Sequence, residues 1–186
     1  MKCKLILLVA AGVALLTACN KEKAPPEEQA LGAFLADSTT RVVKGLYSNI
    51  EIGYRFYASR PGRIIKIGTK LPQAGTYTVS LWDSDTQMLL EQKTVGQTGA
   101  DMLTLQSIPP LTVLPNKKYV VSVYYDSSPK PVHVIVSRGP TAMLPFTKGS
   151  LTVVNAQFRN SQVSTFPVLA DNVGIYGYPE VVFVAD

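Results

Sequence analysis

Apolar and polar side chains alternate along most of the chain from about residue 33 onward, and helical periodicity is nearly absent. Such alternation, in segments rich in β-branched and aromatic residues, predicts short β-strands with one buried face. Within residues 51–58, for example, Ile52 and Tyr54 alternate with Glu51 and Gly53. The predicted strands lie at residues 51–58, 65–67, 77–82, 89–95, 102–105, 119–125, 132–136, 151–158 and 181–184.

Turn-forming residues separate these segments, as at residues 60–63, 83–86 and 126–131, which are rich in Pro, Gly, Asp and Ser. No connection is long enough to carry the helices that parallel strands require, so we expect antiparallel pairing. About eight to ten strands at a spacing of about ten residues predict an all-β fold, an antiparallel β-sandwich of jelly-roll or immunoglobulin-like type. The sequence shows no internal repeat, and residues 33–186 are predicted to form one domain.

Two longer segments, residues 137–150 and 159–180, lack strong alternation, and we expect them to form long loops. Long loops on a rigid scaffold are where binding residues concentrate, because their sequences are free of the constraints of a packed core. We therefore expect these two segments to contribute to any binding site.

The N-terminus has the pattern of an export signal. Two lysines precede an apolar run at residues 5–16, which is shorter than the about 20 residues of a transmembrane helix. The run ends at residues 16–19 (LTAC), which resemble the bacterial lipobox, whose cysteine accepts a diacylglycerol. We predict a lipoprotein signal peptide at residues 1–18 and lipid attachment to Cys19. A buried cysteine behind a failed transmembrane helix is the alternative.

Residues 19–32 are polar, contain Pro25 and Pro26, and are predicted to form a solvated tether. The lipid would hold the protein in the bacterial cell envelope, at the outer membrane, on either its periplasmic face or the cell surface. The charges at residues 21–23 loosely resemble the export signals of Bacteroidetes surface lipoproteins. With one cysteine removed and Cys19 acylated, the mature fold would contain no disulfide.

Composition excludes several classes of function. The chain has 18 basic and 13 acidic residues, and loss of the signal with its two lysines would lower the net charge from +5 to +3. This charge is too small and too dispersed to predict nucleic-acid binding. One His and two Cys exclude a four-ligand Cys/His zinc site, and we expect no metal and no cofactor.

Five segments resemble a known family in the expected order: Glu51–Phe56 (EIGYRF), Gly62–Ile67, Gly75–Asp83 (GTYTVSLWD), Pro115–Tyr125 (PNKKYVVSVYY) and a closing strand within Thr165–Phe183. Over residues 34–184 the chain resembles a bacterial secreted domain of unknown function, DUF4082. The resemblance implies a β-sandwich module of secreted or surface proteins, often beside carbohydrate-active or adhesive domains, with no agreed activity. One departure is the turn after Asp83, where Thr86-Gln87 stands in place of a glycine-containing pair.

Candidate catalytic and metal-binding residues are few. His133 would need a nucleophile and an orienting carboxylate, and we expect it to be a surface or rim residue of its strand. Asp83 and Asp85 begin like a calcium loop, but Met88 occupies the glycine position, so an Asx-type hairpin turn is favoured over a cation site.

Three glutamates, Glu51, Glu91 and Glu180, could serve as glycosidase carboxylates only if the fold brought two of them to about 5–9 Å. We expect each of them to be an outward-facing strand charge instead.

Aromatic residues give the best functional prediction. Trp82, Tyr57 and Tyr124 fall on the strand face opposite the apolar set, where an exposed ring could stack on a sugar. The alternative is that these rings pack under the long loops or in a second core. We expect a non-catalytic binding module, for an extracellular polysaccharide, rather than an enzyme. A structural or adhesive component that binds another envelope protein is the alternative function.

Overall fold

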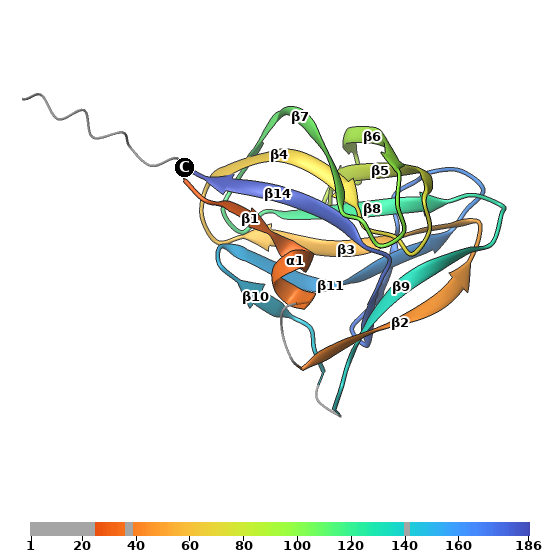
Figure 1. Ribbon diagram of the computed structural model, residues 1–186. Coiled ribbons are helices and arrows are strands. Elements are labelled where there is room, and N and C mark those ends of the chain that lie inside the picture. Colours follow the sequence, from red (N-terminus) through yellow and green to blue (C-terminus); the bar gives the residue numbers. More distant parts are fainter. Residues whose placement is uncertain (1–24, 36–38, 140–141) are drawn as a thin grey trace, which may run out of the picture.

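The computed structural model describes residues 25–35, 39–139 and 142–186, and the predicted signal peptide and Cys19 lie outside these residues. The described residues form fourteen strands and one short helix (Figure 1), which confirms the predicted all-β fold. The elements are β1 (Glu27–Gln29), α1 (Ala30–Leu35), β2 (Thr40–Tyr47), β3 (Ile50–Ala58), β4 (Gly62–Thr69), β5 (Gly75–Asp83), β6 (Leu89–Gln97), β7 (Thr104–Val113), β8 (Lys118–Tyr125), β9 (Lys130–Ser137), β10 (Phe146–Lys148), β11 (Leu151–Asn160), β12 (Leu169–Asp171), β13 (Gly174–Tyr176) and β14 (Pro179–Ala185).

Two antiparallel sheets enclose the core. One contains seven strands in the order β10-β11-β3-β8-β5-β6, with β12 paired to β11, and the other has the order β1-β14-β4-β7. Alternate residues of both sheets point inward and form one buried cluster, as the period-two pattern requires. Its largest fully buried side chains include Tyr54, Phe56, Leu81, Ile64, Ile67 and Phe183. Burial of each such side chain contributes about 1.5–3 kcal/mol to folding.

Strand β7 differs from its prediction, which ended the strand at Leu105, ahead of the turn expected at Pro109 and Pro110. The strand instead runs through both prolines to Val113. It lies at the edge of the four-stranded sheet, where a missing N–H group removes no ladder hydrogen bond if it points outward. The register of the β4–β7 pair also shifts between Ile64 and Lys66, close to the residues opposite the prolines.

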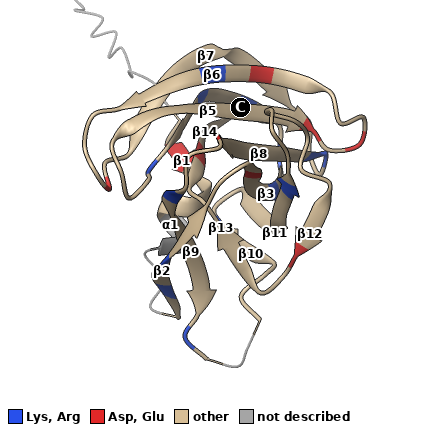
Figure 2. Ribbon diagram, turned by 90° about the vertical axis from the view of Figure 1, so that its right-hand side faces the viewer, with Lys and Arg blue, Asp and Glu red and all other residues tan. Residues whose placement is uncertain are grey.

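A third sheet, with the order β13-β9-β2, extends from one end of the sandwich (Figures 1 and 2). Its edge strand β2 was not among the predicted strands. The reason is its exposure: Val42, Val43 and Leu46 are all exposed, so apolar residues do not mark one buried face. The short strands β10, β12 and β13 occur within the predicted loops because three residues cannot display a period of two.

The N-terminal boundary of the domain also needs correction. Residues 27–32, predicted as tether, form β1 and the start of α1. Strand β1 pairs with β14, and Leu31 is fully buried in the core. The sandwich therefore begins near Glu27, and the two apolar residues that anchor this segment, Ala30 and Leu31, are too short a pattern to indicate it in the sequence.

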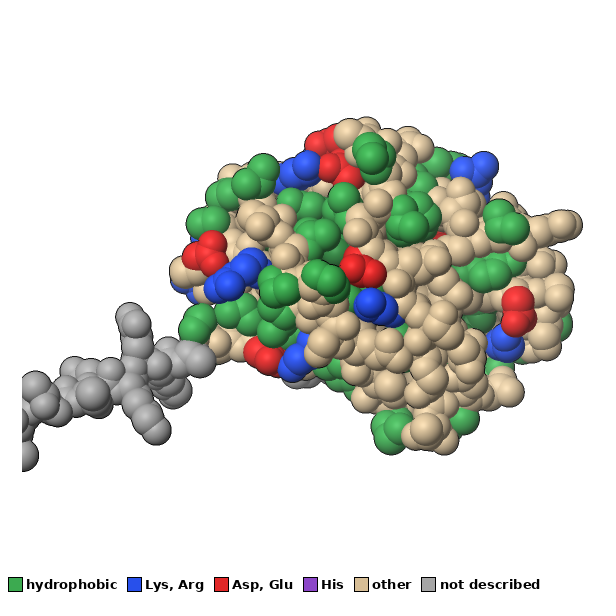
Figure 3. All heavy atoms as spheres, turned by 90° about the horizontal axis from the view of Figure 1, so that it is seen from above, with side chains coloured by type: hydrophobic (Ala, Val, Ile, Leu, Met, Phe, Trp, Pro, Cys, Tyr) green, Lys and Arg blue, Asp and Glu red, His purple; other side chains and the backbone are tan. Residues whose placement is uncertain are grey.

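Charges are spread over the surface of the sandwich. Figure 3 shows basic and acidic side chains of one face scattered among apolar and polar ones, and Figure 2 shows a similar mixture along the strands. Several of these charges form exposed ion pairs, such as Lys66 with Glu27 at 2.8 Å. Exposed pairs of this kind add little stability, about 0–1 kcal/mol each.

Candidate functional site

The three predicted aromatic residues occupy one face of the seven-stranded sheet but form no common exposed surface. Trp82 is only 6% exposed, so the expected exposed ring is wrong. Phe166 packs edge-on against the indole at a centroid distance of 6.0 Å, and the indole N–H donates to Ser122 Oγ at 2.8 Å. Packing under a long loop, the alternative, is what the structure has.

Tyr57 and Tyr124 are half-buried and lie at opposite ends of the β3–β8 pair, where Tyr57 faces Lys118 and Tyr124 faces Glu51. Six residues of strand separate these positions, which corresponds to about 20 Å. They therefore cannot contact one sugar residue together, and their participation in binding stays a prediction.

Glu51 belongs to a buried polar network on the same face rather than to an exposed site. The carboxyl group accepts hydrogen bonds from Ser122 Oγ at 2.5 Å and from the Thr165 backbone N–H at 3.3 Å. Burial raises the pKa of Glu51 to about 7, although hydrogen bonds from Ser122, Ser164 and Thr165 oppose the shift. The prediction of an outward-facing charge is wrong for this residue because the segment that contains Thr165 covers it.

Glu180 is also fully buried, on the other side of the seven-stranded sheet. Its oxygens accept hydrogen bonds from the backbone N–H groups of Leu31 at 3.2 Å and Gly32 at 2.8 Å, and burial raises the pKa of Glu180 to about 7. The nearby Tyr54 ring points into the core, whereas Glu51 points outward from the same strand. The sheet thus separates the two carboxyl groups, and they do not form a glycosidase pair.

The remaining sequence candidates have local roles. Asp83 Oδ1 accepts hydrogen bonds from the N–H groups of Asp85 at 2.9 Å and Thr86 at 3.0 Å, as expected for an Asx-type turn. Its other oxygen pairs with Lys117 at 2.6 Å, and this interaction lowers the pKa of Asp83 to about 2. Gln87 occupies the left-handed region at φ 60°, a conformation that glycine adopts more readily. Both carboxylate oxygens are thus engaged within the protein.

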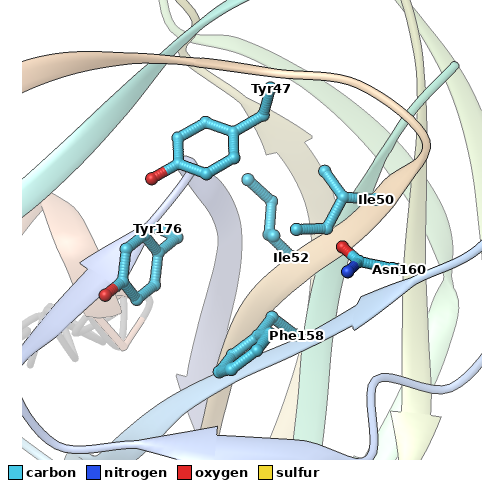
Figure 4. Close-up of a pocket in the computed structure, with 6 residues that line it drawn as sticks. All are labelled: Tyr47, Ile50, Ile52, Phe158, Asn160 and Tyr176. Atoms are coloured by element: carbon cyan, nitrogen blue, oxygen red, sulfur yellow. The ribbon is translucent and has the colours of Figure 1, made fainter. Parts of the chain in front are cut away.

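Three other aromatic side chains do meet at a pocket, at the end of the sandwich where β2 turns into β3 (Figure 4). The pocket has a volume of about 290 Å³. Side chains from four strands line it: Tyr47 from β2, Ile50 and Ile52 from β3, Phe158 and Asn160 from β11, and Tyr176 from β13.

The rings hold one another in edge-to-face contacts. The Tyr176 ring lies 6.4 Å from the Tyr47 ring and 6.2 Å from the Phe158 ring, with interplanar angles of 74° and 63°. The chain turns away directly after Tyr176 at Gly177, whose φ is 77°. A Cβ atom at this glycine would lie 3.1 Å from Ile52. A side chain at position 177 would therefore be strained in the backbone and crowded against the pocket floor.

Polar groups flank this apolar interior. The Tyr176 hydroxyl donates to Asp171 Oδ2 at 2.9 Å, and burial together with this bond raises the pKa of Tyr176 to about 12. The Tyr47 hydroxyl forms no hydrogen bond within the described part of the chain. In Figure 4 both hydroxyls point to one side of the pocket, and the Asn160 carboxamide lies across from them. The pocket thus offers flat apolar walls with hydrogen-bonding groups at its edges.

The alternation pattern of the sequence does not indicate that these residues form one pocket. Asn160 and Tyr176 fall within the predicted loop 159–180, so that prediction identified the right segment. Tyr47 lies in the strand that was not predicted, and Phe158 belongs to the inward face of its strand. Residues from such distant segments come together only through strand order, which the alternation pattern does not encode.

The described residues thus form an antiparallel β-sandwich with an aromatic pocket at one end. The chain belongs to the family described as Domain of unknown function (DUF4082), whose model matches residues 36–178. The match includes every residue that lines the pocket and leaves β1, α1 and β14 outside. No curated protein matches the sequence. Within the described residues, no helix has the length and apolar character needed to cross a membrane.

Proposed function

We propose that this protein is a lipid-anchored, non-catalytic binding module of the bacterial cell envelope that holds an extracellular glycan in the aromatic pocket. The observation that carries the proposal is the convergence of Tyr47, Phe158 and Tyr176 on one pocket that reaches the surface. The C–H groups of a pyranose pack favourably on the negative face of an aromatic ring. A few polar groups at the edge of such a pocket supply orientation and specificity.

The dimensions of the pocket support a small portion of a glycan as ligand. A volume of about 290 Å³ is near the lower end of ligand pockets, which hold about 300–1,000 Å³. One sugar residue, or the end of a chain, is therefore the expected occupant. The hydroxyl of Tyr47 and the amide of Asn160 are the groups expected to bond with sugar hydroxyls.

The arrangement of the acidic residues supports a non-catalytic role. Glu51 and Glu180 are both buried and lie on opposite sides of the seven-stranded sheet, and neither lines the aromatic pocket. The lipid anchor at Cys19, at the outer membrane, is part of the proposal through the sequence pattern of residues 5–19. Incorporation of radiolabelled palmitate into the intact chain, and its loss in Cys19→Ala, is the expected result.

Binding is tested by affinity electrophoresis of the full chain in gels that contain soluble polysaccharides such as xylan, pectin or dextran. We expect retardation by at least one polysaccharide. Tyr47→Ala should weaken this binding about tenfold, because a ring contact contributes about 1 kcal/mol or more. Tyr57→Ala is the matched control, since Tyr57 is a half-buried tyrosine on a different face. Loss of binding in Tyr57→Ala with normal binding in Tyr47→Ala would place the site elsewhere.

A protein partner is the second candidate, and the edge strand β2 favours it. Val42, Val43 and Leu46 are exposed on this strand, and Leu46 is 68% exposed. An exposed edge strand can pair with an added strand of a partner. Cross-linking of intact cells would then capture an envelope protein, and Leu46→Lys would reduce the capture.

A further inference from the structure

A second pocket lies on the reverse face of the β13-β9-β2 sheet. Neighbouring residues of β2 point to opposite faces, so Val42 and Lys44 face away from Tyr47 and the aromatic pocket. Lys44 pairs with His133 of β9, and the two side chains share the reverse face. The pocket has a volume of about 280 Å³ and is lined by Val42, Lys44, Lys70, Asp101, His133 and Tyr178.

Two lysines at this pocket have no acidic partner among the described residues. Neither Lys44 nor Lys70 forms an ion pair within the part of the chain that the structure describes, whereas other lysines do. The ammonium group of Lys70 lies 5.8 Å from the centre of the Tyr178 ring, which positions it at the pocket wall. Burial lowers the pKa of His133, and the hydrogen bond and charge of Asp101 oppose this shift. The positive charges of Lys44 and Lys70 also lower the pKa, so both lysines act on the same imidazole.

The acidic residue of the pocket is already engaged. Asp101 Oδ1 lies 2.7 Å from His133 Nε2, and the backbone N–H of Asp101 donates to the carbonyl of Leu71 at 2.8 Å. His133 is buried, contrary to the predicted rim position, because β2 and the loop that contains Asp101 cover it. With the lowered pKa the imidazole is neutral near pH 7 and donates from Nε2 to the carboxylate. One carboxylate against two ammonium groups leaves the pocket with a positive charge.

The walls of the pocket are suited to more than a bare ion. The Tyr178 ring packs edge-on against His133 at 6.5 Å, and Val42 adds an apolar side chain. The Tyr178 hydroxyl forms no hydrogen bond within the described residues, so it is available to a ligand. Tyr178 is only 3% exposed, so its hydroxyl rather than its ring is offered to a ligand. The pocket therefore combines one phenolic hydroxyl, an apolar contact and two cations within the volume of one sugar residue.

We propose that this pocket binds an acidic sugar residue, a hexuronic acid, whose carboxylate lies between Lys44 and Lys70 and one of whose hydroxyls bonds with the hydroxyl of Tyr178. The inference does not depend on the aromatic pocket, because the two pockets are on opposite faces of the β13-β9-β2 sheet and share no lining residue. This pocket would select for negatively charged sugars, whereas the aromatic pocket presents mainly apolar walls.

The experiment uses the full chain and follows the imidazole resonances of His133 by NMR, since this is the single histidine of the sequence. Sodium glucuronate is titrated, with glucose and sodium sulfate as comparison probes. We expect a saturable shift with glucuronate, no shift with glucose, and binding of sulfate about tenfold weaker than that of glucuronate. Lys44→Met and Lys70→Met should each weaken glucuronate binding about tenfold.

Lys118→Met is the matched control because it removes the same charge from β8, where Lys118 is exposed and forms no ion pair within the described residues. An equal loss in this variant would overturn the proposal in favour of a general effect of net charge. Sulfate binding as tight as glucuronate would overturn the sugar part, and no saturable shift with glucuronate would overturn the site. Tyr47→Ala should leave the glucuronate titration unchanged, so this result and that of the polysaccharide test remain separable.

Discussion

Substitution of Glu51 by Gln should make the protein more stable at alkaline pH. The carboxyl group is fully buried, and its pKa rises from 4.5 to about 7 in the folded protein. The native state therefore holds this proton more tightly than the unfolded chain does. Stability from this group is fully present below pH 4.5 and is lost as the pH rises towards 7.

The magnitude follows from the size of the shift. A rise from 4.5 to about 7 corresponds to a loss of about 3 kcal/mol of unfolding free energy between acid and alkaline pH, since each unit is worth about 1.4 kcal/mol. A glutamine side chain at this position would not titrate. Its oxygen can accept from Ser122 and its amide group can donate to Ser164, but the hydrogen bond from the Thr165 N–H would be lost at every pH, because the amide nitrogen is not an acceptor. We expect the stability of Glu51→Gln relative to wild type to rise by about 3 kcal/mol between about pH 4 and about pH 8.

Urea unfolding at about pH 4 and about pH 8 measures both values, and fluorescence of Trp82, the single tryptophan, reports the transition beside the substituted residue. Burial also raises the pKa of Glu180 to about 7, so Glu180 contributes a similar loss of unfolding free energy between acid and alkaline pH. The dependence of the unfolding free energy on pH should therefore be about half as steep in Glu51→Gln as in the wild type. Glu91→Gln serves as control, because Glu91 is partly exposed and pairs with Lys93 on the surface. Identical pH slopes in wild type and Glu51→Gln would refute the reasoning.

Two further predictions concern packing. Phe166→Ala should uncover the Trp82 indole and shift its fluorescence emission to longer wavelength. It should also lower the unfolding free energy by about 3 kcal/mol or more, because the ring contact at 6.0 Å and the buried area of Phe166 are lost. An unchanged emission maximum would show that the loop does not shield the indole. Leu31→Ala should lower the unfolding free energy by about 2–5 kcal/mol in urea denaturation, because Leu31 is fully buried; a change below about 0.5 kcal/mol would mean that β1 and α1 are not part of the cooperative unit.

The fold was predictable from the sequence where strands have one buried face. Strand β3 is an example, since Ile52, Tyr54 and Phe56 are fully buried as their alternation requires. Strand β2 was not predictable, because its apolar residues are exposed on both faces of an edge. Strand β7 was predicted too short, because only its edge position tolerates Pro109 and Pro110.

The candidate site was less predictable than the fold. The alternation of residues along each strand correctly placed Trp82, Tyr57 and Tyr124 on one face of the seven-stranded sheet. Alternation cannot show that Phe166 covers the indole of Trp82. Loop contacts and strand order decide which outward residues remain exposed. The same limit applies to Glu51, which has the pattern of an ordinary outward charge until the segment that contains Thr165 is seen to lie over it.

The pairing of β1 with β14 fixes where the chain enters and leaves the sandwich. Glu27 lies opposite Val184, so both termini of the domain emerge at one edge, whereas β2 ends at Tyr47 on the opposite side in Figure 1. If Cys19 carries the proposed lipid, a force on the lipidated N-terminus would act first on the Glu27–Val184 pair, where β1 begins to pair with β14. The aromatic pocket, which lies where β2 ends, would then be on the side of the domain opposite to the point where the anchored chain enters.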